Sequence, residues 1–139
     1  MLKELNAEKL TLYPNTSAQP LAEQLSAQYG IPTDRIFVGV GSDDVLGMAF
    51  LTCFNSDKEI LFPDITYSFY PVWADLFKIP YNRPALDENF CIKKEDYFAE
   101  NGGIVIANPN APTSIAMPLA DIEEIVAKNP DSVVIVDEA

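Results

Sequence analysis

The segment Gly103–Ser114 constrains the fold more than any other part of the chain. Residues 104–107 form an uninterrupted apolar run that is β-branched at three positions, as expected of a strand buried on both faces. The run breaks into Asn-Pro-Asn-Ala-Pro-Thr-Ser, and its two prolines prevent any helix or strand from continuing. In open α/β sheets, ligands bind at loops of this kind, beyond the carboxyl end of a parallel strand. An ordinary strand-to-helix connection is the alternative reading of the same residues.

Apolar strand-like runs alternate with helical patterns along the rest of the sequence. We predict strands at residues 35–40, 59–63, 78–81, 104–107 and 131–137, with helices between them and a short helix at 93–98. This alternation predicts an α/β fold with a mostly parallel sheet and helices on both faces. We expect one α/β unit over residues 1–139, and we expect it to be truncated after Ala139, because a buried strand is a poor place for a domain to end.

Charge and composition exclude several classes of function. The net charge is −12, which argues against a nucleic-acid surface and against a polybasic membrane patch. The chain has no histidine, so it holds no Ser-His or Cys-His catalytic pair, and we expect no metal site. Cys53 and Cys91 are far apart among apolar neighbours, so we predict buried thiols in a reducing compartment. With no signal peptide and no apolar run of membrane-spanning length, we expect a cytoplasmic protein.

The turn Gly41-Ser42-Asp43 is the first candidate binding site. A glycine-led turn that enters a helix offers free N–H groups and the positive end of the helix dipole, which suit a phosphate group. The alternative is a capped helix start in which Ser42 or Asp43 bonds its own backbone.

Asp137, Tyr67 and Tyr13 are the other candidates. Asp137 ends the last predicted strand, where its carboxylate can meet a protonated ring nitrogen or cap a following helix. Tyr67 follows the strand at 59–63, where an aromatic ring can stack on a planar ligand or pack into the core. Tyr13, before Pro14, reads on its own as an amphipathic tyrosine in a loop.

Taken in order, these motifs resemble the fold type I aminotransferases that use pyridoxal 5'-phosphate (PLP). The chain is most similar to the histidinol-phosphate aminotransferases of that family, which serve histidine biosynthesis, from about residue 10 to the end. The resemblance implies part of the large PLP-binding domain and amino-group transfer between a small-molecule donor, histidinol phosphate, and 2-oxoglutarate. It also implies a homodimer.

The resemblance assigns roles to individual residues. It implies that Gly41, Ser42 and Asp43 lie at the cofactor phosphate and that Tyr67 stacks on the pyridine ring. It implies that Asp137 pairs with the protonated ring nitrogen, and that Tyr13 reaches the phosphate of the partner subunit's cofactor.

The sequence departs from the family pattern in the loop and in its lysines. The family asparagine that bonds the cofactor's phenolic oxygen is replaced here by Ala111, with Asn108 or Asn110 as substitutes, and the family glycine is Ser114. No lysine occupies the family's Schiff-base position, and Lys93, Lys94 and Lys128 lie in polar segments. We therefore expect no catalytic residue, no turnover by these residues alone, and at most weak PLP binding.

Two further interpretations stay open at this point. Another fold type I enzyme, an aromatic aminotransferase or a decarboxylase of a phosphorylated amino acid, fits the same motifs. A non-catalytic binding or assembly module fits the changes at Ala111 and Ser114.

Overall fold

The computed structural model describes residues 12–139, and the chain divides into two compact units between Val40 and Gly41. The N-terminal unit (residues 1–40) contains helix α1 (Gln19–Tyr29) and the short 3-10 helix η3 (Thr33–Arg35). A proline in the first turn and a left-handed Gly30 after the last residue bound α1, as the sequence predicts. The sheet lies in the second unit, residues 41–139, which we call the sheet unit. The prediction of one α/β unit over residues 1–139 stays a prediction.

The predicted strand at residues 35–40 is wrong for this structure. Apart from the end of η3, these residues have no regular secondary structure, and Phe37 and Val40 are 64% and 92% exposed. An apolar run forms a strand only where a neighbouring strand accepts its backbone hydrogen bonds. Local sequence cannot supply that neighbour.

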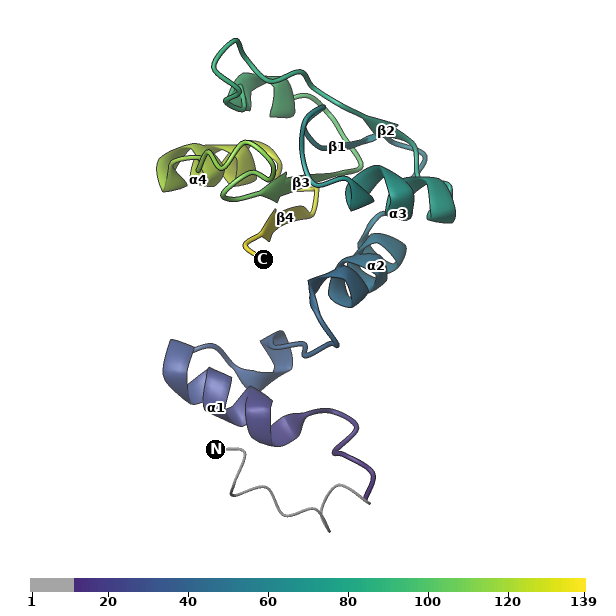
Figure 1. The fold of residues 1–139 in the computed structure, drawn as a ribbon, viewed down its shortest axis with the longest axis vertical. Helices are drawn as coiled ribbons and strands as arrows, with labels where there is room; N and C mark the ends of the chain where they lie inside the picture. The colour runs from purple at the N-terminus through teal and green to yellow at the C-terminus, as the bar shows by residue number, and fades with distance from the viewer. Residues whose placement is uncertain (1–11) are drawn as a thin grey trace. The chain divides into compact units, whose positions relative to one another are not determined.

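The sheet unit contains a four-stranded sheet in the order β2-β1-β3-β4, and every pairing in it is parallel. The strands are β1 (Ile60–Leu61), β2 (Tyr81–Asn82), β3 (Gly103–Ala107) and β4 (Val134–Asp137). The helices are α2 (Ser42–Cys53), α3 (Phe69–Phe77), the 3-10 helix η4 (Lys94–Tyr97) and α4 (Leu119–Lys128). Figure 1 shows these elements along the chain.

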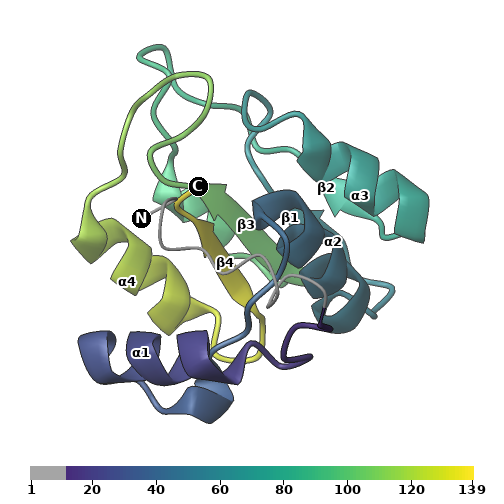
Figure 2. The same cartoon turned by 60° about the horizontal axis from the view of Figure 1, so that its bottom comes forward.

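Two hydrophobic clusters cover the two faces of this sheet. One contains Val105 and Ala107 of β3 with residues of α2 and α3, and the other contains Ile104 and Ile106 with Ile125 of α4. Alternate side chains of a strand point to opposite faces, so β3 contributes to both clusters and is buried along its whole length. Figure 2 shows α2 and α3 on one side of the strands and α4 on the other. The predicted parallel sheet with helices on both faces is confirmed.

The order of the strands places a crevice at one end of the sheet. From β1 the chain moves outward through α3 to β2, then returns past β1 to β3, and then moves the opposite way through α4 to β4. The loops after β1 and β3 therefore diverge at a topological switch point, the position where open α/β sheets bind ligands.

Several predicted burial assignments are wrong. The spacing of Ile122, Ile125 and Val126 predicts that all three face inward on α4. Ile122 and Ile125 are buried, but Val126 is 48% exposed. The thiol-bearing residue Cys53 is exposed and Cys91 is half-buried, so neither is the fully buried thiol that its neighbours suggested. An apolar neighbourhood in sequence does not show which side of a helix faces the sheet.

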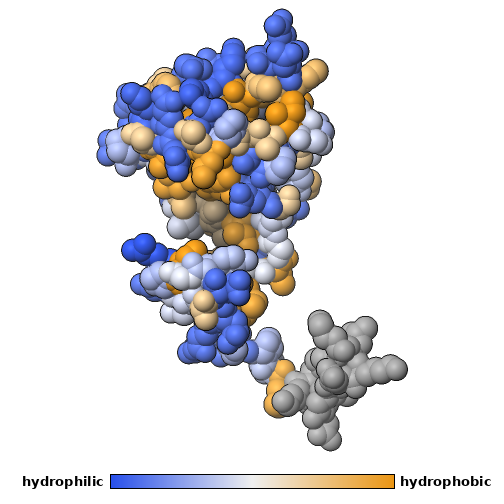
Figure 3. Space-filling view, turned by 90° about the vertical axis from the view of Figure 1, so that its left-hand side faces the viewer, coloured by the Kyte–Doolittle hydropathy of each residue, from blue (hydrophilic) through white to orange (hydrophobic). Residues whose placement is uncertain are grey.

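Figure 3 shows patches of polar and apolar residues side by side on one face of the molecule. Three apolar residues on or beside α4 and β4 are exposed to solvent: Leu119, Val126 and Val133. No helix within residues 12–139 is long and apolar enough to cross a membrane.

The close packing of β3 against α2 predicts a large effect of adding one methyl group at Gly103. A Cβ atom there would lie 2.2 Å from Cε1 of Phe54, and Gly103 has a φ of +148°. We expect G103A to lower the free energy of unfolding of the complete protein by roughly 1–3 kcal/mol, measured by urea unfolding. G30A is the control, because a Cβ at Gly30 meets nothing within 4 Å and carries only the cost of its φ of +68°. Equal losses in the two variants would contradict the steric explanation.

The buried hydroxyl group of Tyr97 generates a second prediction. Tyr97 is 1% exposed, and its hydroxyl group has no hydrogen-bond partner. We expect Y97F to raise the free energy of unfolding at neutral pH by about 1 kcal/mol, because an unpaired buried hydroxyl group is costly.

The same variant should change the response to alkaline pH. Burial, followed by the charges of Asp96 and Asp64, raises the pKa of Tyr97, so the folded chain keeps a proton that the unfolded chain releases above about pH 10. Stability contributed by this proton is complete below that pH and is lost as the pH rises. Urea unfolding of Y97F should therefore show a shallower alkaline loss than the unsubstituted protein, and parallel curves would contradict this.

Candidate cofactor site

A cavity of about 250 Å³ lies at the carboxyl ends of β3 and β4. We call it the site cavity, and it is lined by Ser42, Tyr67, Ala107, Pro109, Ala111, Asp137 and Ala139. Three of the predicted site residues, Ser42, Tyr67 and Asp137, thus share one cavity although they are distant in sequence. The topology explains the meeting, because the lining comes from the loops after β1, β3 and β4 and from the start of α2.

Strand pairing positions Asp137. Its partner in the parallel ladder is Ala107, and the amide of Asn108 donates to its backbone oxygen at 2.8 Å. Laterally paired residues point to the same face, so the carboxylate emerges beside Ala107, on the face covered by α2 and α3. There Tyr70 of α3 donates its hydroxyl hydrogen to Oδ2 of Asp137 at 2.8 Å. Oδ1 accepts the backbone N–H of Ala139 at 3.2 Å.

The start of α2 has the features of an anion site. Gly41 is the N-cap residue of α2 and has a φ of +108°, a conformation that favours glycine. No side chain makes a capping hydrogen bond at this end of the helix. The first N–H groups of any helix lack intrahelical partners and lie at the positive end of its dipole. Ser42, the first residue of α2, lines the site cavity. Backbone amides at this end can therefore bind a phosphate group.

The carboxylate of Asp43 is bound to Tyr67. The hydroxyl group of Tyr67 lies 2.9 and 3.1 Å from the two carboxylate oxygens of Asp43. This hydrogen bond is the main reason that the pKa of the Tyr67 phenol is raised, followed by burial and by the charges of Asp43 and Asp137. Asp43 thus fixes the hydroxyl end of Tyr67. The ring of Tyr67 packs against the ring of Phe69, with centroids 5.8 Å apart.

The two asparagines of the loop have different partners. The Asn110 side chain is 3% exposed and donates to Ile65 O at 2.9 Å and to Thr113 Oγ1 at 3.2 Å. Its oxygen accepts the hydroxyl group of Thr66 at 2.8 Å. Both amide hydrogens of Asn110 are therefore used inside the protein. The bonds to Ile65 and Thr66 fix the loop after β3 to the loop after β1, and the bond to Thr113 lies within the loop after β3.

Asn108 braces the same loop at its other end. Its oxygen accepts the N–H of Met117 at 2.7 Å, and its amide group is 3.5 Å from Met117 O. The use of Asn108 or Asn110 toward a ligand stays a prediction, and of the two only Asn108 keeps an amide hydrogen without a partner among these bonds.

The family's asparagine and glycine positions also have visible geometry. Ala111 lines the site cavity with a methyl group, which cannot donate a hydrogen bond. Ser114 has a φ of +60°, and its N–H donates to Asn110 O at 2.7 Å. A glycine adopts that left-handed conformation more easily than serine does, by about 1 kcal/mol. Both proline bonds of the loop, at Pro109 and Pro112, are cis.

The remaining predicted residues lie outside the cavity. Tyr13 belongs to the N-terminal unit and is fully exposed, so its role toward a partner subunit stays a prediction. Lys93 pairs with Asp96 at 3.1 Å, and Lys94 pairs with Asp121 at 2.6 Å and Glu124 at 2.8 Å. Of the residues that line the site cavity, none is a lysine.

Sequence reasoning missed the role of Tyr70. The residue reads as one of several aromatics on the face of a helix, and its partner Asp137 is 67 positions away. Tyr67 lies just before α3 and Tyr70 in its first turn, and the two rings are 5.7 Å apart. Closeness to Tyr67 in the sequence is therefore the available signal.

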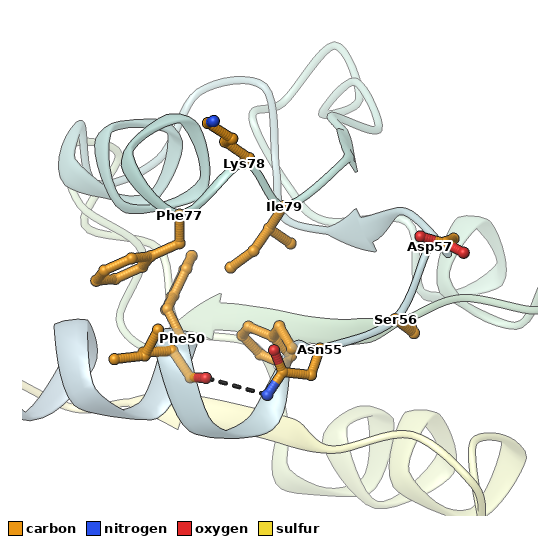
Figure 4. Close-up of a pocket in the computed structure, with 9 residues that line it drawn as sticks. Phe50, Asn55, Ser56, Asp57, Phe77, Lys78 and Ile79 are labelled. Atoms are coloured by element: carbon orange, nitrogen blue, oxygen red, sulfur yellow. Dashed lines mark hydrogen bonds between the residues drawn. The ribbon is translucent and has the colours of Figure 1, made fainter.

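A second hollow lies at the opposite ends of α2 and α3. It has a volume of about 190 Å³ and is bordered by residues 50, 51, 54–57 and 77–79. Figure 4 shows Phe50, Phe77 and Ile79 around it, with Lys78 and Asp57 well apart from each other. Asn55 donates to Leu51 O at 3.3 Å, which closes the end of α2. The charged side chains at the edge of this hollow, Lys78 and Asp57, do not point toward one another, so the hollow does not resemble a reactive site. In residues 12–139, no cluster of acidic or cysteine side chains is suited to a metal ion.

The bond between Tyr67 and Asp43 predicts a measurable change in acidity. We expect D43N to lower the pKa of Tyr67 toward the ordinary tyrosine value of about 10, because the accepting charge is removed. The measurement is the tyrosinate absorbance of each protein during alkaline titration, with the Y67F variant in the same background subtracted. Identical Tyr67 titrations with and without the substitution would show that Asp43 does not hold the phenol in solution.

Comparison with known proteins identifies the family of this chain. The family model for aminotransferase class I and II matches residues 1–139. A histidinol-phosphate aminotransferase from Lactococcus lactis subsp. cremoris is 49% identical over 139 residues, covering 100% of this chain and 39% of that protein. The chain thus spans about two fifths of the length of such relatives.

Solved structures share the fold. The histidinol-phosphate aminotransferase from Clostridium acetobutylicum has a TM-score of 0.83 at 22% identity, over 95% of this chain and 40% of that one. The L-threonine-O-3-phosphate decarboxylase from Porphyromonas gingivalis has a TM-score of 0.73 at 14% identity, over 93% and 40% of the two chains. The matched family is PLP-dependent. With its family model matched from the first residue to the last, this chain belongs to the aminotransferases of class I and II.

Proposed function

We propose that this chain forms part of the large, PLP-binding domain of a histidinol-phosphate aminotransferase. The name of the 49% identical Lactococcus relative supports the substrate, and family membership supports the reaction class. The proposed reaction transfers the amino group of histidinol phosphate to 2-oxoglutarate, a step of histidine biosynthesis.

The observation that carries the proposal is the single cavity shared by Ser42, Tyr67 and Asp137. It offers a carboxylate, an aromatic ring and the amide-rich start of α2, which match the ring nitrogen, the planar ring and the phosphate group of PLP. The residues present therefore fit the cofactor. Asp43, predicted at the phosphate, has its carboxylate hydrogen-bonded to the Tyr67 phenol, and this donor offsets part of the repulsion between the carboxylate and an anion.

Each residue has a distinct task in the proposed site. Bound PLP would supply an aldehyde group that can accept an amino group and a pyridine ring that withdraws electrons from it. Asp137 holds the proton on the ring nitrogen, because a carboxylate stabilises a nearby positive charge. Tyr67 covers a ring face and excludes water from it. The amides of Gly41 and Ser42 bind the phosphate and fix the orientation of the ring.

The rest of the catalytic machinery is proposed to come from elsewhere. Within residues 12–139, the lining of the site cavity contains no lysine, so we expect residues 1–139 on their own to be inactive and to bind PLP at most weakly. We also propose a homodimer, in which the exposed Tyr13 contacts the cofactor phosphate of the partner subunit.

A cofactor titration and an amino-donor panel test the proposal. The complete protein that contains this chain should bind PLP, seen by its absorbance, and should react with histidinol phosphate faster than with aromatic amino acids. Preference for an aromatic amino acid would favour an aromatic aminotransferase, and release of carbon dioxide from a phosphorylated amino acid would favour the decarboxylase. Absence of PLP binding would contradict all three enzymes and favour a binding module.

Substitution of Asp137 is the sharpest single test of the site. We expect D137N to weaken PLP binding roughly 10- to 100-fold, because it removes a charge-assisted hydrogen bond of about 1.5–3 kcal/mol. E88Q is the matched control, since it neutralises an exposed carboxylate that does not line the cavity. Equal PLP affinities of the two variants would remove Asp137 from the proposed site.

A further inference from the structure

Tyr70 contacts Asp137 but does not line the site cavity. Its hydroxyl group donates to Oδ2 of Asp137 at 2.8 Å, whereas the cavity lining includes Asp137, Ser42 and Tyr67 but not Tyr70. A residue in this position can affect a bound ligand only through Asp137 or through the neighbouring ring of Tyr67.

The surrounding core holds Tyr70 in one place. The side chain is fully buried, and its ring lies between Phe50, at a centroid distance of 6.4 Å, and Phe62, at 5.9 Å. The ring of Tyr67 contacts it edge-on at 5.7 Å. Because α2 and the sheet pack around the ring, the hydroxyl group has little freedom to move away from the carboxylate.

The phenol is a permanent donor at physiological pH. Burial, followed by the hydrogen bond to Asp137 and the charges of Asp137 and Tyr67, raises the pKa of Tyr70 far above its usual range. The hydroxyl group therefore keeps its proton, and the carboxylate oxygen that it contacts is always the acceptor.

We propose that Tyr70 is a positioning residue of the cofactor site, whose hydroxyl group fixes one carboxylate oxygen of Asp137 and so directs the carboxylate at the ring nitrogen of PLP. This inference rests on the proposed function and adds a residue to it. The carboxylate sits at the end of a strand, and its other oxygen accepts the N–H of Ala139 at the longer distance of 3.2 Å. The Tyr70 hydroxyl group therefore adds the shorter of these two bonds, from a fully buried side chain. The hydrogen bond selects one orientation before any ligand arrives, and the binding energy is then not spent on ordering the side chain.

A purely structural role for Tyr70 is the competing explanation. A buried tyrosine can stabilise the core by its ring alone and affect cofactor binding only through general loosening of the fold. The two explanations differ in what happens when Asp137 is also changed. A positioning residue loses its effect once the group that it positions is altered, whereas a structural residue does not.

The test is a double-mutant cycle of Y70F and D137N in the complete protein, with PLP affinity as the readout. Y70F keeps the ring and removes only the hydroxyl group, so its fold should be retained, which thermal unfolding checks. We expect Y70F to weaken PLP binding about 3- to 10-fold, as the loss of one hydrogen bond implies. In the D137N background we expect the same substitution to change the affinity less than about twofold.

A second readout reports on the ring nitrogen itself. The absorption spectrum of bound PLP as a function of pH should differ between Y70F and the unsubstituted protein, because a less well-oriented carboxylate stabilises the ring proton less. Y97F is the matched control, since it removes another buried phenolic hydroxyl group that has no hydrogen-bond partner. It should leave both the affinity and the spectrum unchanged.

Each outcome has a distinct meaning. Equal loss of affinity in both backgrounds, or an unchanged affinity and spectrum in Y70F, would overturn the positioning role while leaving the proposed function intact. Failure of the unsubstituted complete protein to bind PLP would overturn the proposed function, and the inference with it. A loss that disappears in the D137N background, together with a shifted spectrum, would establish Tyr70 as a positioning residue.

Discussion

The pairing of β3 with strands on both sides is the constraint on which the rest of the sheet unit depends. β3 is the longest strand of the sheet and is buried throughout, and its alternate side chains belong to the two separate hydrophobic clusters. Its ladder with β4 fixes where Asp137 ends, because Ala107 pairs with Asp137. Its ladder with β1 fixes the loop that carries Tyr67. The site is therefore a consequence of strand register, and a shift of one residue would turn Asp137 to the opposite face.

Electrostatics pose a problem that two tyrosines solve. The chain carries a net charge of −12, yet the proposed ligand is an anion. Each of the two carboxylates near the site accepts a phenolic hydrogen bond, Asp43 from Tyr67 and Asp137 from Tyr70. Phenol donors disperse carboxylate charge without adding a cation, and both stay protonated at physiological pH because their pKa values are raised. The uncapped start of α2 then presents N–H groups as the attractive partner for a phosphate.

Features that depend on local pattern could be predicted from the sequence, and those that depend on distant partners could not. The apolar run at 104–107 and the prolines after it predicted a buried strand and a loop beside a site. Both predictions depend only on residues that are adjacent in the sequence. The strand at 35–40 failed because strand formation requires a neighbour that the run itself does not specify. The predicted burial of Val126 and Cys53 was wrong, because the spacing of apolar residues identifies one face of a helix but not how much of that face is covered by the sheet.

The site shows the same division between local and distant information. Ser42, Tyr67 and Asp137 could be picked out because each follows or precedes a recognisable element. The bonds that hold them could not, since Tyr67 reaches Asp43 across 24 positions and Tyr70 reaches Asp137 across 67. The sequence shows that serine replaces the family glycine at position 114, but it does not show that Ser114 adopts a left-handed conformation, which costs free energy.

The all-parallel sheet has a consequence for how this part of the protein folds. Parallel neighbours are never adjacent in the chain, so each pairing must close a long loop before it gains any contact energy, which makes folding slow. β4 follows β3 along the chain and supplies Asp137. During synthesis the central strand therefore waits for its final neighbour, and no partial site exists until that neighbour docks. A ligand that binds only the assembled site draws the chain toward the fully paired sheet. Under the proposed function, the cofactor would be such a ligand and would stabilise the late pairing of β4.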